Sequence, residues 1–460
     1  MPQAPEPSPT TNLPSARPAP LPLATGGGRP APGAWAMWAV AVAVYLTAVF
    51  HRSGLAVASL DAEQRFHIGP SVLAVFVAVQ LGIYAAMQIP TGAMADRYGP
   101  RRMLLAAVTL MAVGEIAFAL GHDAGTALLG RALVGFGDAV TFLSVLRLVQ
   151  NWFPVSRYGL LAAFTSLVGG IGQLVSTVPL HAGLVHLGWT PMFAVSGLVT
   201  LAVGAPVWLA LRDRPGPRVA PARREPPDRL VVAVREVMGR RGTWRGMWAH
   251  FSLTGPFAVF TALWGYPFLV RAEHYQPARA SDALALVVVA AVLGAPPIGA
   301  LMVRAPRHRT KVVYGAGGLL LGSWITTLAI GAGRDPAWVV IVLLVATGIG
   351  GPASAIAFDL ARESNRHQRG GAATGVVNIG GFTGAVLADL VIGGLLDTVG
   401  HGGHSPAGFD WAMAVVPVMV AVGMAAFWWC GRPTDAGDAS AADPARSDGG
   451  PPTKVAGTIG

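Results

Sequence analysis

The chain has 460 residues, of which 53% are hydrophobic and 12% are charged, whereas roughly 25% of a soluble domain is charged. This composition excludes an ordinary soluble protein and indicates one that lives in a membrane. The formal net charge of +10 does not indicate a nucleic-acid partner, because the basic residues are scattered in short segments between apolar runs. The single cysteine, Cys430, excludes an intrachain disulfide and a cysteine metal cluster.

Twelve segments are apolar and long enough to cross a bilayer, which takes roughly 20 residues. The sequence therefore predicts an all-α membrane protein, with no strands and an even number of crossings. The predicted spans are 34–60, 71–93, 103–121, 125–150, 158–181, 190–211, 245–270, 281–303, 311–332, 337–358, 371–396 and 409–430.

Three segments lack the apolar residues needed to fold. These are a Pro-rich head at 1–33 and a tail at 431–460, both predicted to be disordered, and an Arg- and Pro-rich linker at 212–244. The linker divides the spans into an N-terminal bundle at 34–211 and a C-terminal bundle at 245–430, and a short surface helix is expected within it around Leu230 to Met238.

The distribution of Lys and Arg predicts the orientation. If the N-terminus is inside, the inner segments hold 26 of these residues and the outer loops hold four. Because basic loops resist translocation, both termini are expected in the cytoplasm.

A charged hairpin separates the second and third apolar segments. Gly99 and Pro100 are expected to end one helix, so that the next begins with two arginines, and an acid and an arginine before the turn could pair across it. In a polytopic chain this pattern resembles the loop between helices 2 and 3 of the major facilitator superfamily of secondary transporters. The resemblance implies a gating role for Gly92, Asp96, Arg97, Gly99, Arg101 and Arg102.

A degenerate copy of this hairpin follows the eighth span. Gly299, Arg304 and Arg309 recur at matching offsets, while Val303 replaces the acid and Pro306 replaces the second glycine. The repeat and the resemblance together imply two pseudo-symmetric six-helix bundles with a solute site between them.

Ionisable residues deep in a span are costly unless they are paired or face a wet cavity, so each is a functional candidate. In the fourth span, Arg131 and the following glycines resemble the family motif whose arginine is implicated in proton coupling. Glu115 lies at a depth similar to that of Arg131, which predicts a pair between them, whereas Asp138 is about 10 Å from Arg131 along the helix. The predicted proton-coupling residues are Glu115, Arg131 and Asp138, although the pair could also only lock two helices together.

The first span carries His51-Arg52, followed by small residues, and resembles helix 1 of anion-transporting branches of the family, with His51 where Asp is frequent. An arginine fork suits a carboxylate or phosphate. Arg52 could instead snorkel to water, and His51 could simply pack against a neighbouring helix. The expected substrate-binding residues are Arg52, His51, Gln80, His250 and Asn378, of which Asn378 lies in a stretch that faintly resembles nitrate carriers.

No phosphate-binding loop and no metal-ligand spacing occur in the chain, so no enzyme activity, cofactor or metal is expected. The predicted function is proton-coupled import of a small organic anion across a cytoplasmic inner membrane, by a monomer whose partners are a solute, protons and lipid. Two alternatives are proton-antiport efflux of drug-like compounds and a non-transporting sensor with a transporter fold.

Overall fold

The computed structural model describes residues 30–215, 227–331, 333–366, 369–398 and 405–432. Most of the head and the tail that were predicted to be disordered, and the middle of the linker, lie outside the described residues. The described part is helical, and twelve of its helices are long and apolar enough to cross a membrane, which confirms the number predicted.

Six spans come from the N-terminal half. They are α1 (Ala34–Phe66), α2 (Pro70–Tyr98), α3 (Pro100–Leu120), α4 with α5 (Ala124–Ala139 and Thr141–Trp152), α6 with α7 (Val155–Val175 and Val178–Leu187), and α8 (Trp189–Leu209). Most of these helices run past the predicted boundaries, because a helix continues beyond its apolar stretch into the headgroup region.

The other six spans come from the C-terminal half, after the linker helix α9 (Pro227–Met238) that the sequence predicted. They are α10 to η2 (Arg241–Val259, Phe260–Trp264, Gly265–Pro267 and Phe268–Ala272), α12 (Pro277–Arg304), η3 with α13 (Pro306–His308 and Arg309–Ile330), α14 with α15 (Ala337–Ala353 and Ile356–Glu363), α16 (Gly370–Thr398), and α17 with α18 (Pro406–Met413 and Val415–Cys430).

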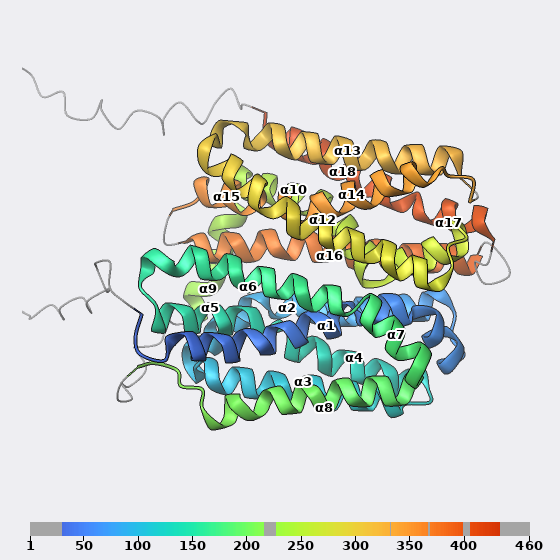
Figure 1. Ribbon diagram of the computed structural model, residues 1–460. Coiled ribbons are helices and arrows are strands. Elements are labelled where there is room, and N and C mark those ends of the chain that lie inside the picture. The colour runs from blue at the N-terminus through green and yellow to red at the C-terminus, as the bar shows by residue number, and fades with distance from the viewer. Residues whose placement is uncertain (1–29, 216–226, 332, 367–368, 399–404, 433–460) are drawn as a thin grey trace, which may run out of the picture.

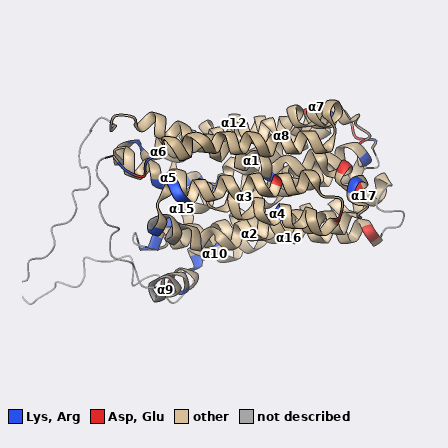
Figure 2. Cartoon of the chain, turned by 90° about the horizontal axis from the view of Figure 1, so that it is seen from below, with Lys and Arg blue, Asp and Glu red and all other residues tan. Residues whose placement is uncertain are grey.

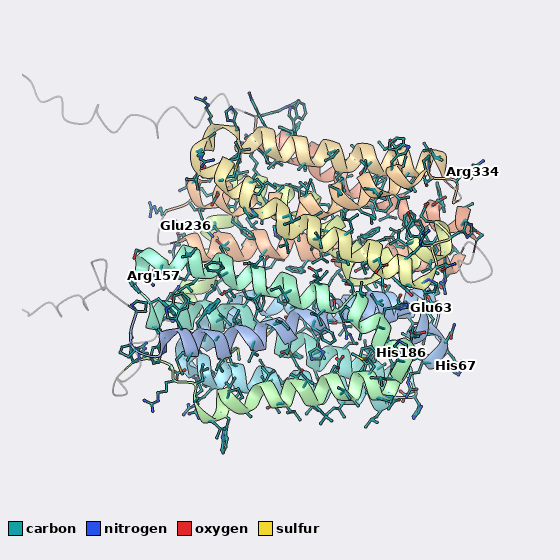
Figure 3. The ribbon with its side chains drawn as sticks, in the orientation of Figure 1. Glu63, His67, Arg157, His186, Glu236 and Arg334 are labelled. Atoms are coloured by element: carbon teal, nitrogen blue, oxygen red, sulfur yellow. The ribbon has the colours of Figure 1, made fainter. Side chains whose placement is uncertain are left out.

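The two halves form two layers of nearly parallel helices (Figure 1), in which α1 to α8 make one layer and α10 to α18 the other. The first and the last described residues lie at the same end of the molecule. Figure 3 places Arg157 and Glu236 at this end, and Glu63, His67, His186 and Arg334 at the opposite end. We call the first of these the terminal end and the second the distal end.

The seventh span departs most from a regular helix. Pro256, Gly265 and Pro267 lie within it, and it contains two π-helical segments, η1 and η2, on either side of the three-residue α11. Gly265 and Pro267 permit a bend here. Segments of π-helix are often found at functional sites.

The hairpin between α2 and α3 turns at Gly99, whose φ of 81° favours glycine. The Asp213 carboxylate caps the start of α3 by accepting a hydrogen bond from the Arg101 backbone N–H at 2.7 Å. Arg97 stacks on the Tyr98 ring, 4.9 Å from its centroid, and Arg102 is exposed. The side chain of Asp96 and the surroundings of Gly92 are not described, so the predicted pairing of Asp96 with Arg97 remains a prediction.

The halves are joined near the distal end. Glu63 of α1 forms an ion pair with Arg271 of η2, in which Arg271 Nη1 lies 3.4 Å from Glu63 Oε1. Gly393 of α16 packs so closely on α2 that a Cβ there would lie 2.8 Å from the Pro70 carbonyl oxygen. These contacts tie the first span to the seventh and the second to the eleventh.

Lys and Arg residues gather at the terminal end, around α5, α9, α10 and α15 (Figure 2). This is the distribution expected if that end faces the cytoplasm. The orientation nevertheless remains a prediction.

Candidate functional site

Two glycines bring α3 and α4 into close contact beside the predicted ionic pair. A Cβ on Gly114 would lie 2.6 Å from the Gly130 carbonyl oxygen, and a Cβ on Gly130 would lie 2.6 Å from the Gly114 carbonyl oxygen. Only glycine permits this reciprocal approach. Because Glu115 and Arg131 are the next residues on the two helices, the contact sets the spacing between their side chains.

Glu115 and Arg131 are both buried, with the Glu115 Oε2 atom 4.0 Å from Arg131 Nη1. The pair predicted from their depths is therefore present as a charge contact. Arg131 also donates from Nη2 to the His51 carbonyl oxygen at 3.0 Å and to Gln80 Oε1. The arginine thus connects α4 to α1, α2 and α3 inside the N-terminal half.

His51 completes this buried network. Its Nδ1 lies 3.2 Å from Glu115 Oε1, as a charge contact rather than an aligned hydrogen bond, and its Nε2 lies 2.7 Å from Thr200 Oγ1. The Thr200 hydroxyl also lies 2.9 Å from the Ser196 carbonyl oxygen, to which it can donate a hydrogen bond.

The network thus brings an imidazole, a carboxylate and a guanidinium together inside the bundle. Among the described residues, Glu115 Oε2 and Arg131 Nη1 have no hydrogen-bond partner.

A second pair lies beside the first. Arg52 Nε and Nη2 donate to the two carboxylate oxygens of Asp138 at 2.7 and 2.6 Å, in the two-pronged geometry that makes arginine pairs strong. Asp138 is fully buried, whereas 16% of the Arg52 side chain is exposed. The guanidinium also stacks on the Tyr84 ring, 4.3 Å from its centroid.

The predicted substrate residues lie in different surroundings. His51 and Gln80 are 1% exposed and belong to the buried network, and His250 is 4% exposed with its ring 4.9 Å from that of Phe358. Asn378 is half-buried on α16. Of the five, Arg52 alone combines a charge with the partial exposure that a ligand contact requires.

Sequence reasoning missed several partners. It did not pair Arg52 with Asp138, although each lies 14 residues from the distal end of its helix, at Phe66 and Ala124. It also missed Thr200 and Asp213, since neither hydroxyls nor end-of-helix acids stand out in an apolar sequence. Within the described residues, no group of three or more His, Cys, Asp or Glu side chains could hold a metal ion.

A separate acidic site lies at the distal end of the C-terminal half, around Glu273, which directly follows the seventh span. Burial raises the pKa of Glu273 to about 8, and the carboxyls of Asp335 and Asp410 add to the rise. The ordinary value is 4.5, so between about 4.5 and about 8 the folded protein binds a proton that the unfolded chain has released. This group's contribution to stability is complete below that range and is lost as the pH rises through it.

Replacing Glu273 by Gln should therefore remove a fall in thermal stability that accompanies a rise in pH across that range. Thermal unfolding of the purified protein, followed by intrinsic fluorescence, measures the effect. Asp282→Asn, at an exposed position of the same half, is the control and should keep the wild-type slope. An unchanged slope in Glu273→Gln would contradict the assignment.

Twelve membrane helices in two layers, with charged pairs buried inside one of them, define the class of polytopic membrane carriers. The chain belongs to the Major Facilitator Superfamily, whose family model matches residues 37–388. The expected fold class of two six-helix bundles is thereby confirmed.

Three comparisons illustrate the relationship. The chain is 22% identical over 293 residues to a probable L-galactonate transporter of Escherichia coli, covering 62% of this chain and 60% of that one. It is 26% identical over 205 residues to a methyl viologen resistance protein of Salmonella typhimurium, and the match covers 44% of this chain and 39% of that one. Its fold matches a bacterial homolog of the human lysosomal transporter Spinster, in an inward-facing and unoccupied conformation, with a TM-score of 0.66, 15% identity, and 87% and 97% coverage.

Proposed function

We propose that this protein imports a small organic anion together with protons by alternating access, and that Arg52 binds the anion. The observation that carries the proposal is the pair between a partly exposed Arg52 and a fully buried Asp138. An arginine that remains charged at all physiological pH values, held by an acid that can be neutralised, is suited to exchange one carboxylate for another.

The pair provides a physical reason for coupling. While Asp138 is ionised, both of its oxygens occupy the Arg52 fork, so an incoming carboxylate must compete with it. Protonation of Asp138 removes that competition and leaves the arginine available. Proton and anion then bind together, and the net charge of the pair with its ligand changes little, which limits the cost of moving them through the membrane.

The His51–Glu115–Arg131 network is proposed as the place through which this proton reaches and leaves Asp138. Arg131 contacts the His51 backbone carbonyl, and Arg52 is the next residue along α1. A change of protonation at Glu115 therefore acts on the same turn of helix that carries the anion-binding side chain. The similarity to a probable L-galactonate transporter supports this class of solute, because galactonate is a carboxylate.

The conformation described is proposed to be the one closed at the distal end. The Glu63–Arg271 ion pair and the packing of Gly393 on α2 hold the two halves together there. In the opposite state these contacts would separate. The distal end is then the outer face, with both termini in the cytoplasm of a bacterial cell, and the protein is proposed to work as a monomer.

Replacing Arg271 by Ala should shift the protein toward the state open at the distal end. The pair is only slightly exposed, so we expect the closed state to lose about 1 kcal/mol of stability relative to the open state. This changes the ratio of the two states about fivefold. A cysteine at Ala74, which is buried against Gly393, reports the shift by its rate of reaction with an impermeant thiol reagent in a Cys430→Ser background. Arg279→Ala is the control, and equal rates in all variants would argue against a gate at this pair.

Efflux of drug-like compounds is the alternative, favoured by the match to the methyl viologen resistance protein. An assay of purified protein in liposomes distinguishes import from efflux. The vesicles are tested with sugar acids, other carboxylates and cationic dyes under an imposed proton gradient. Accumulation of carboxylates with protons supports import. Extrusion of cationic dyes supports efflux and contradicts the assignment of Arg52 to an anion.

A further inference from the structure

Asp389 is the buried carboxyl that the charge networks described above do not include. It lies on α16 in the C-terminal half and is 0% exposed. Neither carboxylate oxygen has a hydrogen-bond partner among the described residues, and no basic side chain of these residues lies within 4.0 Å of it. An ionised carboxylate without a partner is strongly disfavoured in such surroundings, whereas the neutral acid is tolerated.

Asp389 lies on the face of α16 that meets the other half of the protein. Phe382, seven residues before it, and Gly393, four residues after it, are on the same face of the helix. The Phe382 ring lies 4.7 Å from that of Tyr84 on α2, and a Cβ on Gly393 would lie 2.9 Å from the Ala74 Cβ. Asp389 is thus placed along the seam between α2 and α16, between two contacts that close it.

The seventh span borders Asp389 on another side. The Trp264 indole N–H of η1 donates to the Asp389 backbone carbonyl at 3.3 Å. Trp264 is fully buried at the last residue of the first π-helical segment. The acid is therefore held where α2, α16 and the irregular seventh span meet, in elements from both halves.

The titratable groups nearest Asp389 along these elements are His250 on α10, which faces Gly381 two turns toward the terminal end, Tyr84 on α2, Tyr266 on α11, Asp410 on α17, and Asp397 two turns further along α16, which lies beside Gly69. Arg52 lies behind the Tyr84 ring and is already bound to Asp138. None of these groups supplies a counter-charge that would stabilise an ionised Asp389 in the closed seam.

We propose that Asp389 is a proton-binding site of the C-terminal half, and that the distal seam closes only when this carboxyl is neutral. When the two halves separate at the distal end, this face of α16 becomes accessible to water. A carboxylate oxygen of Asp389 then takes a proton from a hydronium ion of the outer medium and leaves a water molecule. The neutral acid is buried again when the seam closes. The inference rests on the alternating access proposed above.

The test uses the full chain in lipid nanodiscs, without solute, in a Cys430→Ser background. Spin labels on cysteines at His67 and Arg334, which lie at the distal end in opposite halves, report its opening. Wild-type protein should show a closed population that falls between about pH 5 and about pH 9. Asp389→Asn mimics the neutral acid. At the upper pH its closed-to-open ratio should therefore be at least about tenfold higher than that of wild type, which corresponds to one unit of pKa.

Asp282→Asn is the matched control, since it removes an exposed acid of the same half, and it should behave as wild type. Infrared spectra provide a second reading, in which wild-type protein shows the C=O band of a buried protonated carboxyl and Asp389→Asn lacks it. A wild-type pH response in Asp389→Asn, or an unchanged carboxyl band, would overturn the proposal. Because no solute is present, a failure to accumulate anions would contradict the proposed function and leave this result standing.

Discussion

Replacing Arg52 by Ala is expected to abolish uptake and to destabilise the folded protein by about 3–5 kcal/mol, because it leaves the buried Asp138 carboxylate without its partner. Both carboxylate oxygens lose a hydrogen bond at once. Uptake in proteoliposomes and thermal unfolding in detergent measure the two effects. Of the substitutions considered, this one has the largest expected loss of stability.

Loss of stability and loss of a ligand contact must be separated, and the chain offers two variants for this. Arg52→Lys keeps the charge but loses the fork, so uptake should fall about 10- to 100-fold with less destabilisation. Arg52→Ala combined with Asp138→Asn removes both charges and should recover much of the stability without recovering uptake. Normal apparent affinity for the anion in this double variant would exclude Arg52 as the anion-binding residue.

Glu115→Gln is expected to uncouple solute movement from protons. The amide cannot bind the proton that the proposed coupling requires, while its size is nearly that of the buried Glu115 side chain. Exchange of labelled for unlabelled solute should continue within a few-fold of wild type. Accumulation driven by a pH gradient should fall at least about 100-fold, in keeping with the usual contribution of a positioned acid or base.

Ser196→Ala is the control for this experiment. Ser196 Oγ lies 3.5 Å from Glu115 Oε1, at the limit of a hydrogen bond, and the hydroxyl also donates to the Phe193 carbonyl. Its loss should change gradient-driven accumulation less than about threefold, in line with the small net value of one neutral hydrogen bond. Gradient-driven accumulation at wild-type level in Glu115→Gln would show that the coupling proton is bound elsewhere.

The overall fold was predictable because its signals are local. Each span is a long apolar run, and the break at Gly99 and Pro100 follows from the stereochemistry of those two residues. The number of spans, the linker helix and the contact between Glu115 and Arg131 followed from such features. The close approach of Gly114 and Gly130 also leaves a trace in the sequence, since each glycine directly precedes one of the two charged residues.

The rest of the site depends on how helices of unequal length are aligned. The helix α1 has 33 residues and α3 has 21, so counting from the distal end places His51 ten residues deeper than Glu115. The two are nevertheless in contact, although the distal ends of α1 and α3 also meet, with the Phe66 and Phe118 rings 5.6 Å apart. No count along a single helix predicts such an offset. The contact of His51 with Thr200 likewise joins residues that are 149 apart in the sequence.

The most direct test of the account is a measurement of proton movement when solute is added. Proteoliposomes with a weakly buffered interior and an internal pH indicator are mixed with the anion that the uptake panel identifies. The account predicts that solute entry acidifies the interior in wild-type vesicles and that Glu115→Gln vesicles exchange solute without acidification. Anion entry into wild-type vesicles with no change of internal pH would contradict it.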